Sequence, residues 1–322
     1  MTASMSSSTS TVRPVITVTG AVQFYSLGIT DAHNHVWIKS LDDSDPTNPV
    51  LNQPDLILQE LIDFRLSGGG TILDCQPGYC GRDGNRLLEL SKSSEVNIIA
   101  CTGFHRRKYY PSTNEFWSLN SQSAADLFIS ELSVGLKETL PSKQTVQAGF
   151  IKIALEESWG KSPRDFLEAA AFAAAKTGAV LEIHTEKGAL SAEIPMFFEK
   201  LGVLPVQLVI CHIDKLVDFG VHTELAKAGV LLEYDTFFRP KYKPEEYLWP
   251  LIDRMVNAGL GHRVALATDM AEKEMYHAIG RGPGLASLPG KIQTRLKERG
   301  ISENIIKQLV GGNIAARLAR IN

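Results

Sequence analysis

The chain alternates between short β-rich runs and longer runs with helical periodicity, and this alternation limits the possible folds more than any other feature. Eight runs are typical of strands, at residues 29–36, 71–75, 98–102, 149–154, 180–184, 208–212, 230–234 and 264–268. Helical spacing of apolar residues separates them, at 55–65, 84–93, 124–139, 164–176, 194–201, 216–228 and 246–258. Because parallel strands need a crossover connection, repeated strand–helix units predict a parallel sheet.

Eight such units fit a closed (β/α)8 TIM barrel, which typically takes about 250 residues. The remaining sequence predicts a short N-terminal β-hairpin near 15–22 and C-terminal helices through 301–319. A doubly wound open sheet is the competing fold, but the glycines at 68–70 precede a strand instead of following one, so they do not fit a phosphate-binding turn. We expect a disordered tail over 1–12 and one barrel domain over 13–322.

Composition excludes several classes of protein. The 322 residues are 44% hydrophobic, which allows one large core, and a net charge of −3 with scattered basic residues argues against a nucleic-acid partner. The Ser/Thr-rich start has no apolar core of a secretory signal, and no run approaches the ~20 apolar residues that cross a membrane. Four cysteines without a pairing motif indicate core thiols in a reducing cytoplasm: Cys75, Cys80, Cys101 and Cys211.

Polar side chains follow the strands at the places where a barrel enzyme builds its site. His33 and His35 are two residues apart on the first strand, so they face the same way and could share a metal ion. Further candidates lie in or at the ends of later strands: Lys152, His184, His212 and Asp269. Each has an ordinary alternative, a hydrogen-bonded core histidine, an outward lysine or a helix-capping aspartate. Their joint occurrence at one mouth of the barrel favours a metal site.

The sequence resembles the phosphotriesterase-like family (phosphotriesterase-related proteins) of the amidohydrolase superfamily. Matching segments are GITDAHNH at 28–35, GFIK at 149–152, EIHT at 182–185, VICHID at 209–214, YDT at 234–236 and LATD at 266–269. Shorter matches at 81–83, 100–103, 311–313 and 316–317 extend the resemblance from about Gly20 to the C-terminus. The resemblance implies a hydrolase with two metal ions on a (β/α)8 barrel.

Carried over residue by residue, the resemblance implies a complete ligand set. His33, His35 and Asp269 would hold the more buried ion, and His184 and His212 the more exposed one. Lys152 would be carboxylated, because a carbamate can bridge two divalent cations that a bare ammonium would repel. The ions would be zinc, with manganese, cobalt or iron as alternatives.

The implied chemistry is metal-assisted hydrolysis. Two nearby divalent ions lower the pKa of a bridging water, which then supplies hydroxide near neutral pH. Asp269 would accept the proton and pass it to the leaving group. Asp214 and Asp235 are expected to orient ligands or catalytic groups, and capping or surface solvation is the alternative for both.

The loops around the predicted mouth are basic. We expect His105, Arg106, Arg239 and Arg281 to bind substrate, because arginine grips a carboxylate or phosphate with two donors. Solvated surface charge is the alternative for each. His105 departs from the Thr-Gly-hydrophobic-Tyr pattern of family members that act on lactones. Asn34 replaces a common glutamate between the two histidines and should point away from the metals.

The leading hypothesis is a lactonase or carboxylic esterase that acts on a small anionic lactone, phosphorylated or carboxylated, through a metal-bridging hydroxide. The alternatives are an amidase for an N-acyl amino acid or similar anionic amide and a promiscuous phosphotriesterase, although basic loops suit a neutral triester poorly. The complete set of metal-coordinating residues disfavours a barrel that only binds small molecules without catalysing a reaction. A homodimer is expected only by analogy with the family.

Overall fold

Eight parallel strands form the centre of the molecule, which is described by a computed structural model covering residues 14–319. Neighbouring strands are hydrogen-bonded in the order β10-β9-β8-β7-β6-β5-β4-β3. The strands are β3 (Ile29–Asn34), β4 (Gly69–Asp74), β5 (Asn97–Gly103), β6 (Phe150–Ala154), β7 (Leu181–His184), β8 (Leu208–Cys211), β9 (Leu231–Tyr234) and β10 (Val264–Leu266). Beyond β10, the N–H of Asp269 donates to the carbonyl of His33 at 2.9 Å, so the two edges of the sheet meet.

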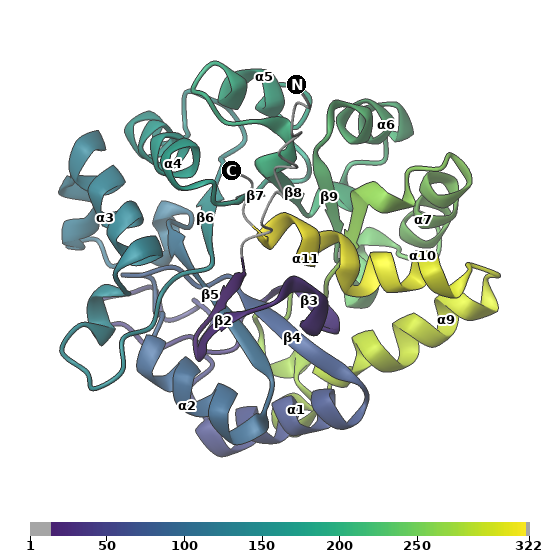
Figure 1. Ribbon diagram of the computed structural model, residues 1–322, viewed down its shortest axis with the longest axis horizontal. Helices are drawn as coiled ribbons and strands as arrows, with labels where there is room; N and C mark the ends of the chain where they lie inside the picture. The colour runs from purple at the N-terminus through teal and green to yellow at the C-terminus, as the bar shows by residue number, and fades with distance from the viewer. Residues whose placement is uncertain (1–13, 320–322) are drawn as a thin grey trace, which may run out of the picture.

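Helices surround this sheet (Figure 1). They are α1 (Pro54–Leu66), α2 (Gly84–Ser94), α3 (Ser121–Ser133), α4 (Arg164–Thr177), α5 (Ile194–Glu199), α6 (Phe219–Ala228), α7 (Leu248–Asn257), α8 (His277–Gly280), α9 (Gln293–Glu298), α10 (Glu303–Lys307) and α11 (Asn313–Leu318). Helix α4 ends at Gly178, whose φ of 70° suits a glycine cap. Helix α3 is shorter than predicted, because Leu136 turns away and donates its N–H to the carbonyl of Val146.

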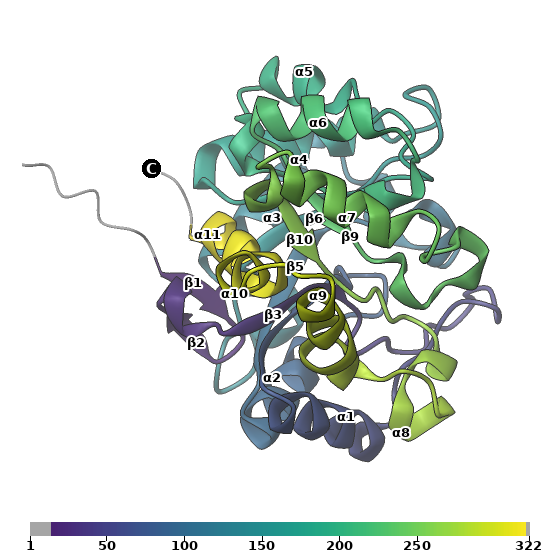
Figure 2. The same cartoon turned by 90° about the vertical axis from the view of Figure 1, so that its right-hand side faces the viewer.

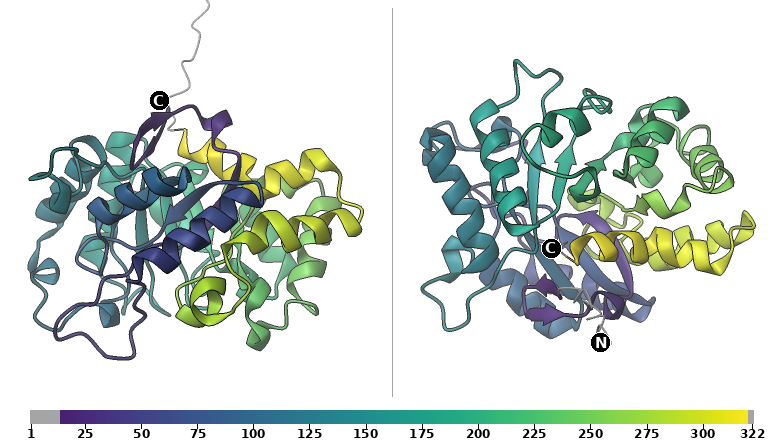
Figure 3. Two further views of the ribbon diagram at one scale, coloured as in Figure 1. Left: turned by 90° about the horizontal axis from the view of Figure 1, so that it is seen from below. Right: turned by 45° about the horizontal axis from the view of Figure 1, so that its top comes forward.

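One end of the barrel is closed by the two termini of the described chain. The hairpin of β1 (Val15–Thr17) and β2 (Gly20–Val22) lies beside α11 at this end (Figures 2 and 3). Val15, Ile314 and Leu318 are buried in one apolar cluster with inward residues of the strands. The predicted TIM barrel, hairpin and C-terminal helices are therefore confirmed. The predicted tail over 1–12 lies outside the described residues, and the single-domain division stays a prediction.

The inward side chains of the barrel form layers, because residues two apart on a strand share a face. Phe150, Val180 and Leu231 belong to the apolar cluster near the closed end. Two residues further along the same strands come Lys152, Glu182 and Glu233, all fully buried. A charged layer thus lies between the apolar core and the strand ends.

Two smaller expectations concern thiols and membranes. All four cysteines are buried and none is in a disulfide. No helix within residues 14–319 is long and apolar enough to span a bilayer. The cytoplasmic location stays a prediction.

Candidate active site

A cavity of about 270 Å³ opens where the strands end. Six residues, the predicted metal ligands, are called the floor of the cavity: His33, His35, Lys152, His184, His212 and Asp269. All of these except Lys152, which lies just beneath, line the cavity. Its rim consists of side chains from the loops after β3, β4, β5, β7, β8, β9 and β10. The structure therefore brings together the residues that the sequence places at separate strand ends.

The backbone turns sharply where two floor residues leave their strands. His212 and Asp269 have positive φ values of 60° and 45°, a conformation that costs energy for residues other than glycine. Such strained positions cluster at functional sites, where the surrounding structure holds them. A register irregularity between Asp31 and Asn34 lies in the stretch of β3 that presents His33. Asn34 points away from the cavity, because its amide donates to Asp31 and Thr268.

Each floor histidine has one ring nitrogen next to an oxygen acceptor. The contacts are His33 Nδ1 with Glu182 and Glu233 at 2.9 Å each, His35 Nδ1 with Gln76 at 2.8 Å, His184 Nε2 with Glu186 at 2.8 Å, and His212 Nδ1 with Asp235 at 2.5 Å. At His35, His184 and His212 the carboxylate or amide oxygen accepts a hydrogen bond from the ring N–H that it contacts. The other nitrogen of these three rings is left with a lone pair, which is the arrangement typical of metal-bound histidines.

Burial keeps these rings uncharged. It lowers the pKa of His35 to about 4 and that of His33 and His212 well below the usual value, with nearby positive charges adding to the effect. Burial also lowers the pKa of His184, although its hydrogen bond with Glu186 acts in the opposite direction. At neutral pH the imidazoles are therefore neutral and able to bind a metal ion.

Asp269 lies close to three of the floor histidines, His33, His35 and His212. Its Oδ1 is 3.8 Å from Nε2 of His33 and 3.9 Å from Nε2 of His35, while Oδ2 is 3.7 Å from Nδ1 of His212. Burial alone would raise the pKa of Asp269, but His212 and Arg239 outweigh it and hold the pKa below its ordinary value. The carboxylate is thus ionised and lies near ring nitrogens of His33, His35 and His212.

Lys152 faces the barrel interior, so the alternative of an outward lysine does not hold. Its side chain is fully buried, and Nζ lies 3.1 Å from Nε2 of His33, 3.5 Å from Glu182 and 3.6 Å from the sulfur of Cys211. The amine is therefore within reach of the floor histidines.

The floor fits a metal centre by its donor chemistry. Ligand atoms of His33, His35 and Asp269 lie within 4.8 Å of one another, and so do those of His212, Asp235 and Asp269. The ring of His184 is 4.8 Å from that of His212. Neutral imidazoles with a carboxylate between them form a donor set that zinc and similar divalent ions prefer.

Asp214 and Asp235 differ in how directly they support the floor. Asp235 accepts from the ring of His212 and so fixes its orientation. Asp214 accepts from the backbone N–H and the hydroxyl of Thr236, at 2.9 and 2.5 Å. Burial, and secondly Asp235, raises the pKa of Asp214 to about 7. Asp214 therefore supports the loop that carries Asp235 and does not contact a floor residue.

The predicted rim arginines are largely engaged within the protein. Arg106 contacts Glu156 at 2.6 Å and Glu186 at 2.5 Å. Arg239 donates to the carboxylate of Asp269 at 2.9 Å and to its carbonyl at 2.5 Å. Arg281 is exposed at the end of α8 and is absent from the residues that line the cavity, so its assignment as a substrate-binding residue is not supported.

His105 is buried at the rim with a defined tautomer. The backbone N–H of Arg106 donates to Nδ1 of His105 at 2.7 Å, so the ring proton is on Nε2. Its ring centre is 4.5 Å from that of Tyr109 and 5.3 Å from that of His184. His105 can therefore offer one N–H donor next to the floor.

Sequence reasoning did not single out Lys215, which follows β8 and lines the cavity. Its Nζ lies 5.4 Å from the ring centre of Tyr242, and Nζ of Lys241 lies 5.1 Å from the same ring. Burial would lower the pKa of Lys215, but nearby aspartates raise it, so the amine stays charged. Within residues 14–319, neither lysine has a carboxylate within 4.0 Å.

The oxygen acceptors behind the histidines were also missed. Glu182 and Glu233 each come two residues before a predicted site residue, on the same strand face, so a charged residue inside an apolar strand was the available signal. Gln76 and Glu186 lie in loops, and no local pattern marks them. Their roles depend on how the chain folds around the floor.

The fold is a parallel (β/α)8 barrel. The histidines, the aspartate and the buried lysine at its strand ends are typical of the active site of a metal-dependent barrel enzyme. The sequence model of the Phosphotriesterase family matches residues 13–316, and the chain belongs to that family. This confirms the resemblance inferred from the motifs.

Similar proteins are hydrolases. The phospho-furanose lactonase of Mycoplasmopsis synoviae (strain 53) is 28% identical over 318 residues, covering 92% of this chain and 89% of the relative. The human N-acetyltaurine hydrolase is 26% identical over 293 residues, covering 86% and 81%. The crystal structure of an amidohydrolase from Mycoplasma synoviae superposes with a TM-score of 0.87 at 26% identity, over 97% of this chain and 93% of that one. The chain is therefore a hydrolytic enzyme.

Proposed function

We propose that this enzyme is a metal-dependent lactonase that opens a small lactone carrying a phosphate or carboxylate group. The phospho-furanose lactonases among its relatives support this choice, since they match nearly the whole chain. The observation that carries it is the pair of lysines, Lys215 and Lys241, beside Tyr242 at the cavity rim. They offer charged donors near the floor without acidic partners in ion-pair contact.

The floor would hold two divalent ions. His33, His35 and Asp269 would bind one, His184 and His212 the other, and Lys152, if carboxylated, would lie between them. Bound ions would polarise the scissile carbonyl and lower the pKa of a water molecule held at the floor. Zinc, manganese, cobalt and iron are all compatible with nitrogen and oxygen ligands.

The side chains around the cavity would bind and orient the substrate. The anionic group would lie between Lys215 and Lys241, with the hydroxyl of Tyr242 as a further donor. Nε2–H of His105 would donate to an oxygen on the opposite side. This arrangement would place the ring carbonyl over the floor.

Asp269 would hold and move the proton. Its Oδ2 would accept a proton from the water molecule that attacks the carbonyl carbon and would pass it to the ring oxygen that leaves, which gives the hydroxy acid. Arg239 contacts that oxygen at 2.9 Å and would keep the carboxylate in a fixed orientation. The bond that breaks is the acyl–oxygen bond of the lactone.

A matched substrate series tests the proposal. Purified protein, loaded separately with Zn²⁺ and Mn²⁺, would be assayed by proton release with a furanose lactone phosphorylated at its side chain and with the same lactone unphosphorylated. We expect turnover of both and a clear preference in kcat/KM for the phosphorylated one. Absence of turnover in all metal-loaded samples, or equal rates for the two lactones, would contradict the proposal.

An amide substrate is the second candidate, and a separate observation favours it. Several relatives are N-acetyltaurine hydrolases, which match 86–87% of the chain. The same floor and the same lysines could serve an anionic N-acyl compound. Comparing a phosphorylated lactone with its lactam, and adding N-acetyltaurine, separates the two candidates, since the lactonase should leave both amides almost untouched.

A further inference from the structure

Within residues 14–319, the first and last strands of the barrel, β3 and β10, are not paired as neighbouring strands, unlike every other adjacent pair. We call the junction between these two strands the seam. It separates residues that are proposed to share one ion, because His33 and His35 lie on or directly after β3, whereas Asp269 lies after β10. The spacing across the seam therefore decides whether the three ligands can meet at the buried ion.

The side chain of Asp31 bridges the seam. Its Oδ1 accepts from the backbone N–H of Thr268 at 3.1 Å, and its Oδ2 accepts from the hydroxyl of Thr268 at 2.6 Å. On its own strand, Asp31 accepts from the N–H of His33 at 3.3 Å and from the amide of Asn34 at 2.9 Å. The same amide donates to the hydroxyl oxygen of Thr268 at 2.7 Å. Asp31 and Thr268 are fully buried, so these bonds are stronger than they would be in water.

The backbone supplies a further bond next to this network. The N–H of Asp269 donates to the carbonyl of His33 at 2.9 Å. At the start of β10, the carbonyl of Val264 accepts from the amide of Asn313 at 2.7 Å, so a residue of α11 supplies the donor there. Next to the floor, the side chain of Asp31 thus takes the place of the hydrogen-bonded ladder that joins the other strands.

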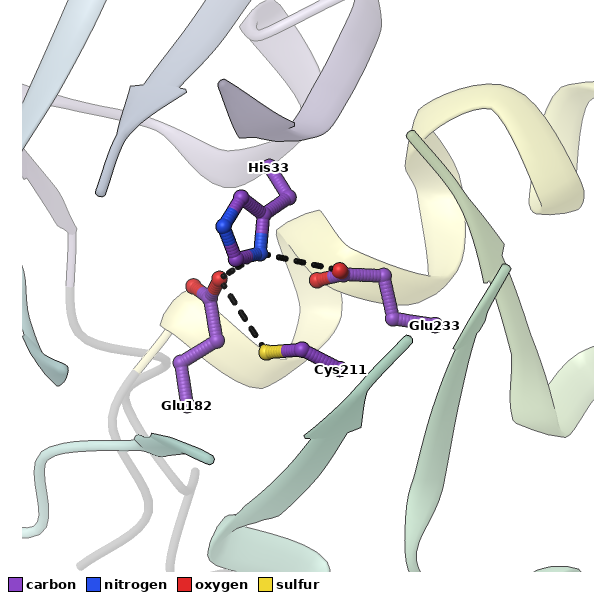
Figure 4. A group of neighbouring side chains, drawn as sticks. All are labelled: His33, Glu182, Cys211 and Glu233. Atoms are coloured by element: carbon purple, nitrogen blue, oxygen red, sulfur yellow. Dashed lines mark hydrogen bonds and ion pairs between the residues drawn. The ribbon is translucent and has the colours of Figure 1, made fainter. Parts of the chain in front are cut away.

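The ring and the backbone of His33 are held by different groups. Glu182 of β7 and Glu233 of β9 both lie 2.9 Å from Nδ1 of the ring (Figure 4). The ring therefore has two alternative contacts, and neither glutamate is singled out by them. The backbone of His33, by contrast, has its N–H on Asp31 and its carbonyl on the N–H of Asp269. The position of this residue along the seam is therefore set by Asp31 and by the strand end that Asp31 contacts.

We infer that Asp31 is a positioning residue, which closes the seam so that the two histidines of β3 and Asp269 lie close enough to hold one ion. The inference rests on the proposed metal centre. Asp31 is singled out because it accepts four hydrogen bonds and its donors come from both sides of the seam. Without its carboxylate these donors would lose that acceptor in a dry interior, which is costly.

The two proposed ions should depend on the seam to different degrees. The buried ion takes ligands from both sides of the seam. The more exposed ion would be held by His184 and His212, at the ends of β7 and β8. These strands are paired up to His184 and Cys211, directly before His212, so a backbone ladder sets their spacing. Loss of the Asp31 carboxylate should therefore weaken the buried ion more than the exposed one.

Asp31→Asn tests this with almost no change in shape. The amide replaces one acceptor oxygen with a donor that faces groups which themselves donate, so at least one bond of the network is lost. Cobalt affinity at the buried site should fall by about 10–100-fold, the range typical of residues that orient metal ligands. Affinity at the exposed site should change little. Thr268→Val keeps the backbone N–H and removes only the hydroxyl, so its loss should be smaller.

The experiment titrates metal-free wild type and variants with Co²⁺, whose visible absorption reports on each bound ion. Competition with a chromogenic chelator gives the affinities, and His35→Gln and His184→Gln assign the signals of the buried and the exposed ion. Wild-type affinities in Asp31→Asn, or an equal loss for both ions, would overturn the inference.

Glu131→Gln on α3 is the matched control. Glu131 is also a buried carboxylate with several hydrogen bonds, which it accepts from Arg82 and from the backbone N–H of Lys137. Its replacement should lower folding stability and leave both cobalt affinities unchanged. A selective loss of the buried ion in this control as well would show that general destabilisation, and not the seam, controls the affinity.

Hydrogen exchange, measured by mass spectrometry, tests the seam without metal. Peptides that contain Thr268 and Asp269 should exchange faster in Asp31→Asn, because their N–H groups bond across the seam to Asp31 and to the carbonyl of His33. Unchanged exchange would overturn the role of Asp31, and Thr268→Val carries both measurements if Asp31→Asn does not fold. A wild type that binds no cobalt would contradict the proposed function, and the exchange data would still decide whether Asp31 holds the seam.

Discussion

The floor and the rim of the cavity differ in how their polar groups are held. Of the floor histidines, His33, His35 and His212 are buried and His184 is partly buried, and each has a side-chain oxygen next to one ring nitrogen, so its orientation is set by the barrel. The rim side chains are longer, come from loops and divide into two kinds. Arg106 is neutralised by two glutamates, whereas Lys215 and Lys241 have no carboxylate in ion-pair contact within the described residues.

This difference suggests that the floor acts on the scissile bond and that the rim selects the substrate. A change in the floor should affect every substrate, because the floor would hold the ions that act on the scissile bond. A change at the rim should affect only substrates with a charged group. The number of cations around the cavity is therefore a poor guide to anion binding, and the pairing of each cation is a better one.

The largest effect should come from Lys152→Ala in the floor. Loss of the bridging side chain should reduce bound metal from two ions per chain and lower kcat by on the order of 1,000-fold, because metal assistance is worth several kcal/mol. Elemental analysis and lactone turnover measure the two effects.

A short carboxylic acid added to the Lys152→Ala variant should restore part of the activity, since it can replace the carboxylated side chain. Lys227→Ala, at an exposed position on α6, is the matched control and should behave as wild type. Full metal content and full activity in the Lys152 variant would show that the floor does not work as proposed.

The next largest effect should be on folding stability, should depend on pH, and concerns Asp74 next to the floor residue His35. Asp74 is buried and accepts the N–H of Val36 at 2.6 Å, directly after His35. Burial raises its pKa from 3.8 to about 7. Between these values the unfolded chain releases its proton and the folded protein keeps it, so folding stability falls as pH rises.

Asp74→Asn keeps the acceptor and removes this titration. The unfolding free energy of this variant should exceed that of the wild type by little at pH 4 and by more towards pH 7. The difference should level off at up to about 4 kcal/mol, because the pKa of Asp74 differs by roughly three units between the folded and the unfolded protein. Urea unfolding at pH 4, 6 and 8 measures it. Glu272→Gln at the exposed rim is the control, and an advantage of Asp74→Asn that does not depend on pH would contradict the assignment.

A smaller effect, restricted to charged substrates, should follow from Lys215→Met or Lys241→Met. A charged hydrogen bond is worth about 1.5–3 kcal/mol, so each change should lower kcat/KM for the phosphorylated lactone by about 10–100-fold. The unphosphorylated lactone should be hydrolysed as before. Lys243→Met is the control in the same loop, since Lys243 contacts Glu246 and does not line the cavity.

The floor was predictable from sequence because its signals are local. A polar residue at the end of an apolar run, as in His184 or Asp269, marks a strand end, and eight strand–helix units then determine that the ends meet. The buried carboxyl groups of Glu182 and Glu233 carried the same kind of signal, an acidic residue within a buried strand. Their partner could be named only once β7, β9 and β3 were seen facing one another.

The rim was less predictable, because loop contacts depend on residues distant in sequence. Arg106 is paired with Glu156 and Glu186, which follow two other strands. Arg281 lies in the loop that the sequence places at the mouth, yet this loop turns so that its side chain is exposed elsewhere. Lys215 directly follows the segment VICHID at 209–214, which contains the floor residue His212, but Lys215 itself belongs to no recognisable motif.

The smallest effect should come from Arg106→Met, which tests whether pairing decides function at the rim. Because Glu156 and Glu186 already balance this guanidinium, its removal should change KM for the phosphorylated lactone by less than about 3-fold, a difference below 1 kcal/mol. Initial rates with both lactones measure it. A loss as large as that of Lys215→Met would mean that Arg106 leaves its glutamates when substrate binds, and the distinction between the two sides of the rim would then be wrong.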